Sequence, residues 1–176
     1  FRKVIKLKPS KPSSHFDIGL CQLRLNKLQE AGKYFRNSIL LDPGFSAGWR
    51  YLSKVFAKQG KSKNQIRTLQ ICLDLSPHDL DLVEGLMDAY IKLSLYKAAC
   101  RLSVKYFTKP INGKILLKSA QAFYCVGDFD RSLSLIDRIF KLPAVPPEAF
   151  IIRGNIMVAK KEFFKAVSNY EEVLNF

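Results

Sequence analysis

Five prolines recur along the chain at an almost constant interval, and this period constrains the fold more than any other feature. Pro9, Pro43 and Pro77 lie 34 residues apart, and Pro110 and Pro143 follow at intervals of 33. Each proline closes an apolar run such as "ILLDP" or "ICLDLSP". Because a proline just past a helix cannot continue it, these runs predict helix C-termini. The period therefore predicts an array of similar units.

Each interval has room for two helices of about 12–15 residues, separated by a short polar break. Gly60 and Gly127 occupy the same place in two of these breaks, and apolar residues recur at spacings of three and four, as in Leu69, Cys72 and Leu73. Sustained alternation of apolar and polar residues, the signal of a β-strand, is missing from the sequence. Candidate N-caps precede the new helices: Ser13 or Ser14, Ser46 and Asp79.

Large and small residues also recur at fixed places in the period. The interval from Ser46 shows most of them: Trp49, Leu52, Ser53, Phe56, Gly60, Cys72 and Pro77. Other intervals place Gly19, Ala120 or Gly154 where this one has Ser53. The pattern resembles the tetratricopeptide repeat, a helix–turn–helix unit of the same length. Gln65, Arg153 and Gln22 depart from it, because the family favours a small, an apolar and an aromatic residue at those places.

This resemblance implies an all-α fold, a right-handed superhelical solenoid of antiparallel helix pairs with about five repeats and a leading half-repeat. The register predicts a second-helix remnant at 1–9 and repeats at 12–45, 46–79, 80–112, 113–146 and 147–176. Phe1 and Phe176 both fall inside second helices in this register. We therefore expect the chain to be an excerpt of a longer array.

The sequence offers little for catalysis. It contains no phosphate-binding Gly-x-x-x-x-Gly-Lys-Ser/Thr loop. His15 and His78 both fall at helix starts, where we expect them to be exposed. The four cysteines show no metal-ligand spacing: Cys21, Cys72, Cys100 and Cys125. We expect no enzyme activity, cofactor or metal, and a reducing compartment such as the cytoplasm or nucleus. No apolar run has the length for membrane insertion.

Concave surfaces of helical solenoids commonly bind partners, and first helices line that side. The register places a band of apolar, basic, acidic, basic and again apolar residues there. We predict that these residues form a partner-binding groove: Phe16, Leu20, Arg24, Arg50, Tyr51, Lys54, Lys58, Asp81, Glu84, Asp88, Lys114, Lys118, Gln121, Ile151 and Asn155.

The favoured hypothesis is a protein-binding scaffold within a multi-subunit assembly, whose groove takes an extended peptide or helix with acidic segments. The alternative is a solenoid that binds RNA or DNA, because the net charge is +14. The acidic third repeat and the lack of a regular aromatic ladder speak against that alternative. A third hypothesis is self-association through the repeat ends, where Phe1, Val4, Ile5 and Leu7 form an apolar helix remnant.

Overall fold

The computed structural model describes residues 11–106 and 112–176, and all regular structure within these ranges is helical. The predicted remnant at 1–9 and the turn at Pro110 lie outside the described residues. The helices are α2 (Pro12–Arg24), α3 (Leu28–Leu41), α4 (Ser46–Lys58), α5 (Ser62–Leu75), α6 (Leu80–Lys92), α7 (Tyr96–Tyr106), α8 (Gly113–Cys125), α9 (Phe129–Ile139), α10 (Pro147–Ala159) and α11 (Phe163–Val173). The predicted all-α fold is confirmed.

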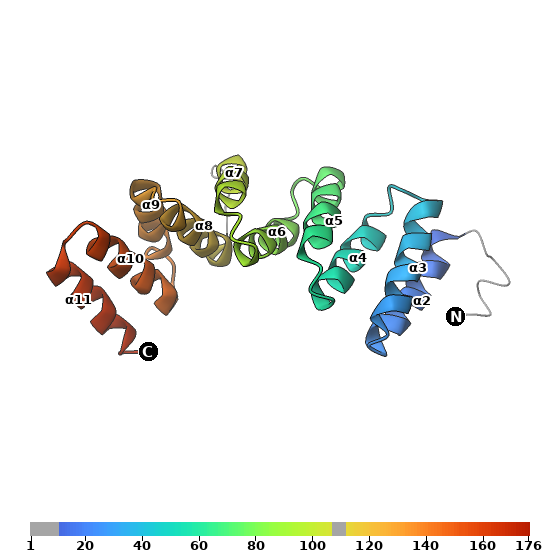
Figure 1. Ribbon diagram of the computed structural model, residues 1–176, viewed down its shortest axis with the longest axis horizontal. Helices are drawn as coiled ribbons and strands as arrows, with labels where there is room; N and C mark the ends of the chain where they lie inside the picture. Colours follow the sequence, from blue (N-terminus) through green and yellow to red (C-terminus); the bar gives the residue numbers. More distant parts are fainter. Residues whose placement is uncertain (1–10, 107–111) are drawn as a thin grey trace. The chain divides into compact units, whose positions relative to one another are not determined.

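The chain divides into two compact units, Phe1–Ala89 and Tyr90–Phe176, and the division falls inside α6. In the first, called the N-terminal unit, α2 packs on α3, α3 on α4, and α4 on α5. In the second, called the C-terminal unit, α8 packs on α7 and α9, while α10 contacts α8, α9 and α11. Figure 1 shows the pairs α2–α3, in blue, and α10–α11, in red, with their helices side by side.

The turns inside the helix pairs share one backbone conformation. A residue with positive φ follows each first helix, and these residues are Asn26 (56°), Gly60 (70°), Ser94 (55°), Gly127 (82°) and Lys161 (63°). The next residue then donates its N–H back across the turn, as Lys61 does to the Phe56 carbonyl at 2.9 Å and Glu162 to the Met157 carbonyl at 2.8 Å. This is the Schellman motif, which satisfies the last carbonyls of a helix. The period seen in the sequence is therefore also a backbone period.

Two of these turn residues should respond to substitution with opposite signs. Lys161→Gly removes a strained left-handed residue, so we expect the free energy of unfolding to rise by up to about 1 kcal/mol. Gly127→Ala should lower it by about 1 kcal/mol, because nothing lies within 4 Å of the added Cβ and only its positive φ opposes the change. Urea denaturation followed by far-UV circular dichroism measures both. Shifts of the same sign would contradict the assignment of strain to φ.

The helix ends agree only partly with their predicted signals. Pro43 and Pro77 each lie two residues beyond a helix end, as predicted. Asp79 caps α6, since its Oδ1 accepts hydrogen bonds from the N–H groups of Asp81 (3.1 Å) and Leu82 (3.3 Å).

The predicted serine caps are wrong. Proline at the first helical position has its φ already set for a helix, so α2 begins at Pro12 and Ser14 lies inside it. Helix α4 begins at Ser46 itself, because the Gly48 N–H already closes the first turn on the Phe45 carbonyl at 2.9 Å.

Each unit has its own apolar core. In the N-terminal unit, the core joins α3 and α4 through Ala31, Phe35, Ile39, Leu52, Val55 and Phe56. Trp49 packs against this core, and its indole N–H donates to the Pro43 carbonyl at 2.9 Å. The tryptophan thus ties the start of α4 to the turn after α3, as the register predicts. In the C-terminal unit, the core joins α8, α9, α10 and α11, with Leu135, Ile136, Ile139, Ile152 and Ile156 among its members.

Close approach within two of the pairs depends on glycine. A Cβ on Gly19 would lie 2.6 Å from the Phe35 ring, and one on Gly154 would lie 2.5 Å from the Tyr170 ring. Both glycines occupy the same place in the repeat, and both partners are aromatic residues of the second helix. The small residue therefore creates the space that the ring of the facing helix fills.

Candidate functional site

A cleft in the N-terminal unit brings together three of the predicted groove residues. Arg50, Lys54 and Asp81 line it, with a cleft volume of about 180 Å³. The remaining lining comes from α4, α5 and the start of α6: Ser53, Ala57, Gln65, Leu69, Leu82 and Gly85. The cleft therefore has an apolar floor and a charged rim. Its volume lies below the roughly 300–1,000 Å³ of small-molecule sites, so it fits one side chain of a ligand.

Arg50 is held by the joint between α5 and α6. Its guanidinium forms an ion pair with the Asp79 carboxylate, and both side chains are partly exposed. The other carboxylate oxygen of Asp79 caps α6. One aspartate thus orients the arginine and begins the next helix. Because the charge of Arg50 is balanced within the unit, Lys54 is the better cation for an acidic ligand.

Lys54 and Asp81 give the rim both signs of charge. Lys54 is exposed, and its Nζ lies 4.6 Å from the centre of the Tyr51 ring. This cation–π contact orients the ammonium group without neutralising it. Asp81 is exposed in the first turn of α6. A ligand that presents an acidic group to Lys54 and a basic or amide group to Asp81 would complement the rim.

The apolar residues predicted for the N-terminal end of the groove belong mainly to the core. The Phe16 ring is half-buried and lies 5.6 Å from Phe35, 5.3 Å from Phe45 and 5.2 Å from Tyr51, measured between ring centres. Leu20 also packs against the core. These side chains are engaged by their own unit, so only their outer edges can touch a ligand.

The other predicted groove residues lie on the first helix of each pair. The exposed ones are Arg24, Lys58, Asp88, Lys114, Gln121 and Ile151, and the half-buried ones are Glu84, Lys118 and Asn155. Asn155 accepts a hydrogen bond from the Tyr170 hydroxyl at 2.7 Å. Lys114 borders an apolar hollow of about 570 Å³ that Leu117, Leu142 and Val145 help to form. None of these residues lines the cleft of the N-terminal unit.

Several cleft residues lie outside the predicted set. Gln65 and Leu69 come from a second helix, whereas the groove prediction uses only first helices. Gln65 does carry a signal in the sequence, because the repeat favours a small residue at its place. Asp79 is visible in the sequence as a helix cap, but its ion pair with Arg50 depends on the packing of three helices.

The histidines and cysteines do not assemble a catalytic or metal centre in the described part of the chain. No group of three or more His, Cys, Asp or Glu residues there could hold a metal ion. His15, expected to be exposed, is half-buried, and its ring centre lies 6.2 Å from that of Tyr34. Burial raises the pKa of the Cys72 thiol to about 11, so this thiol is protonated and unreactive at neutral pH.

Two further surface features concern membranes and self-association. Among the described helices, none combines the length and apolar character that crossing a bilayer requires. Helix α11 and the residues after it expose a set of apolar side chains: Phe163, Phe164, Val167, Leu174 and Phe176. Exposed apolar surface of this kind is typical of interfaces, and self-association through repeat ends stays a prediction.

Comparisons with known proteins identify the fold. No family model matches the chain. The solved structure of YrrB, described as a TPR protein with an unusual peptide-binding site, superposes with a TM-score of 0.86 at 16% identity, covering 99% of this chain and 91% of that one.

Two curated relatives are longer proteins. The PEX5-related protein of Mus musculus is 28% identical over 104 residues, which is 59% of this chain and 18% of the relative. The BBSome complex member BBS4 of Bos taurus is 24% identical over 153 residues, which is 86% of this chain and 29% of the relative. The chain therefore spans less than a third of the length of either relative.

Proposed function

Because the chain has the tetratricopeptide repeat fold, we propose that it is a protein–protein interaction scaffold that binds an extended peptide or a helix of a partner. The cleft between α4, α5 and α6 carries this proposal, since it combines a small apolar floor with fixed charges of both signs. A surface of this kind recognises one side chain by shape and its neighbours by charge. No catalytic machinery is needed for such a role.

The cleft suggests the chemistry of the bound segment. Leu69, Leu82 and Ala57 offer apolar contact to one aliphatic side chain. Lys54 would bind an acidic residue beside it, while Asp81 disfavours a second acidic residue on its own side of the cleft. The proposed ligand is therefore a segment of mixed charge with a short apolar anchor. Asp81 would repel a uniformly anionic polymer, which would therefore bind more weakly than a segment of mixed charge.

The named relatives are consistent with a scaffold role. YrrB is described by its peptide-binding site, and BBS4 is named as a member of the BBSome complex. Both descriptions belong to those proteins. They support the proposal that this chain also works by binding other proteins inside a multi-subunit assembly.

Charge reversal at Lys54 tests the proposal. Proteins captured from a lysate of the source cells by the immobilised full chain are compared, by quantitative mass spectrometry, with those captured by Lys54→Glu. We expect specific partners to fall about tenfold or more, because reversal converts an attraction into a like-charge contact. Lys63→Glu is the matched control, since Lys63 is exposed on α5 outside the cleft and its reversal changes the net charge equally.

Two results would refute the proposal. The first is an unchanged set of captured proteins for Lys54→Glu and also for the double variant Lys54→Glu/Lys118→Glu, which reverses charge in both basic bands of the predicted groove. The second is loss of the captured proteins after ribonuclease treatment, since RNA would then be the ligand. In that case binding should also weaken steeply with salt.

A further inference from the structure

Arg153 occupies an unusual place in the repeat. The corresponding residue is Ile18, Leu52 or Leu86 in three other first helices and Ser119 in α8, and all four are buried. Arg153 lies in α10 and is half-buried, with its guanidinium carbon 5.0 Å from the centre of the Phe140 ring. Stacking on an aromatic face holds the guanidinium in a defined position. A cation therefore lies where the other first helices have an uncharged, buried side chain.

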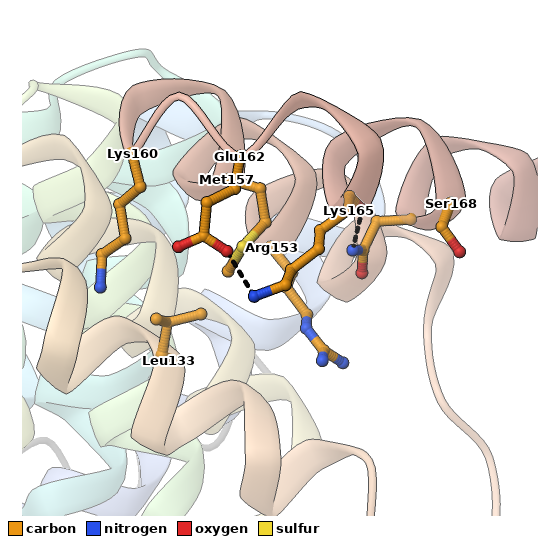
Figure 2. Close-up of a pocket in the computed structure, with 8 residues that line it drawn as sticks. Leu133, Arg153, Met157, Lys160, Glu162, Lys165 and Ser168 are labelled. Atoms are coloured by element: carbon orange, nitrogen blue, oxygen red, sulfur yellow. Dashed lines mark hydrogen bonds and ion pairs between the residues drawn. The ribbon is translucent and has the colours of Figure 1, made fainter.

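The surroundings of Arg153 form a pocket of about 380 Å³ in the C-terminal unit. Leu133 of α9 and Met157 of α10 supply apolar contact. The rest of the pocket comes from α11 and the turn before it, with Lys160, Glu162, Lys165, Ser168 and Asn169. Figure 2 shows Leu133 on one side of the pocket and Met157, Glu162 and Lys165 on the other. This pocket contains none of the predicted groove residues.

The two lysines of the pocket are already paired, whereas the arginine is not. Lys165 Nζ lies 2.6 Å from a Glu162 carboxylate oxygen, and Lys160 Nζ lies 3.2 Å from an oxygen of Asp130. In Figure 2 the Arg153 guanidinium lies apart from the Lys165–Glu162 pair. No carboxylate within 11–106 or 112–176 forms an ion pair with Arg153. Its fork of N–H donors is thus available to a ligand.

We propose that this pocket is a second peptide-binding site, in which Arg153 binds the side-chain carboxylate of a glutamate or aspartate while Leu133 and Met157 contact an adjacent aliphatic side chain. An arginine fork matches a carboxylate in bidentate geometry. Methionine adapts its shape to different aliphatic partners. The site lies on α9, α10, α11 and the turn before α11, so it shares no residue with the cleft at Lys54 and does not depend on the function proposed there.

The balance of charge favours one carboxylate over a polyanion. Three cations and two carboxylates surround the pocket, which leaves one net positive charge. Glu162 in the pocket wall and Asp130 at the rim would repel the successive phosphates of RNA. A segment with one acidic residue between aliphatic residues avoids that repulsion. The pocket therefore selects an isolated acidic side chain in an apolar context.

The test is a titration of the ¹⁵N-labelled full chain with the blocked peptide Gly-Ser-Leu-Glu-Leu-Ser-Gly, followed by nuclear magnetic resonance. We expect shifts at the Arg153 side-chain Nε–H and at the amides of Lys165 and Ser168. Arg153→Gln should weaken binding about tenfold or more, because it removes a charged hydrogen-bond donor from the carboxylate. Arg153→Lys should retain part of the affinity.

Controls separate this site from charge effects and from the other cleft. Lys105→Gln lowers the net charge by the same amount from an exposed place on α7, and it should leave binding unchanged. Lys54→Glu should also leave it unchanged. Arg153→Leu restores the apolar residue of the repeat, so it should fold well and still lose binding. The same peptide with glutamine in place of glutamate should bind at least tenfold more weakly to the unaltered chain.

Three results would overturn the proposal. One is equal binding of the glutamate peptide to the unaltered chain and to well-folded Arg153→Leu. Another is equal binding of the glutamate and glutamine peptides. The third is tighter binding of a uridine decanucleotide at the same resonances, which would identify the site as a contact for nucleic acid.

Discussion

Gly19→Ala is expected to lower the free energy of unfolding of the N-terminal unit by about 1–3 kcal/mol. The added Cβ would lie 2.6 Å from Cε1 and 2.7 Å from Cδ1 of Phe35. The Phe35 ring cannot retreat, because it is 0% exposed and lies 5.6 Å from the ring centre of Phe16 and 5.7 Å from that of Tyr51. Separation of α2 from α3 is then the remaining way to relieve the clash.

The single tryptophan makes this effect measurable in one unit. Trp49 packs on the same core as Phe35, so its fluorescence during urea denaturation follows the N-terminal unit. Gly154→Ala in the C-terminal unit, followed by hydrogen–deuterium exchange, is the matched control, because its Cβ meets the Tyr170 ring at 2.5 Å but that residue is 36% exposed. Tyr170 can swing outward at the loss of its hydrogen bond to Asn155, so a cost near 1 kcal/mol is expected there. If Gly19→Ala lowers the free energy of unfolding no more than Gly154→Ala does, the buried Phe35 ring must be able to move aside.

Ile136→Ala is expected to destabilise the C-terminal unit by about 2–5 kcal/mol. Ile136 lies in α9 and is 0% exposed, within the core that joins α8, α9 and α10. Truncation of the Ile136 side chain removes its apolar contacts with the core. It also leaves a cavity, because the surrounding helices are held by many other contacts and cannot move in to fill it. Hydrogen–deuterium exchange of peptides from 113–159 measures the loss, and their protection should fall together.

Leu174→Ala provides the comparison for this variant. Leu174 is 85% exposed at the end of α11, so its truncation should change stability by less than about 0.5 kcal/mol. A similar loss of protection in both variants would mean that the core around Ile136 contributes little of the stability of the unit.

Features that recur along the chain could be predicted from the sequence. The helix pairs follow from the prolines at constant spacing, and the packing of Gly19 on Phe35 follows from the alternation of small and large residues. Each of these features recurs several times, so accidental residues at one place do not obscure it. The backbone conformation of the turns was harder to predict. Asn26, Ser94 and Lys161 adopt the same positive φ as the glycines, although they carry side chains.

Contacts that depend on the angles between packed helices could not be predicted from the sequence. The register places Phe16 on a first helix, but only the structure shows its ring engaged with three other aromatic rings. The ion pair between Arg50 and Asp79 joins residues 29 positions apart, near the two ends of one predicted repeat. Arg153 was visible as a departure from the pattern, yet its significance required the pocket around it. Departures from a repeat are therefore good places to look for sites.

The shared turn geometry makes each helix pair a module. The five turns inside the pairs, at Asn26, Gly60, Ser94, Gly127 and Lys161, close with the same two backbone hydrogen bonds and have exposed tips. Those hydrogen bonds use only main-chain atoms, so they place little restriction on the side chains at either end of the turn. A gene could therefore gain, lose or exchange whole pairs without altering the turn inside each one, and only the interfaces with the neighbouring pairs would need to adapt. Such arrays can diverge quickly in what they bind while their architecture stays constant.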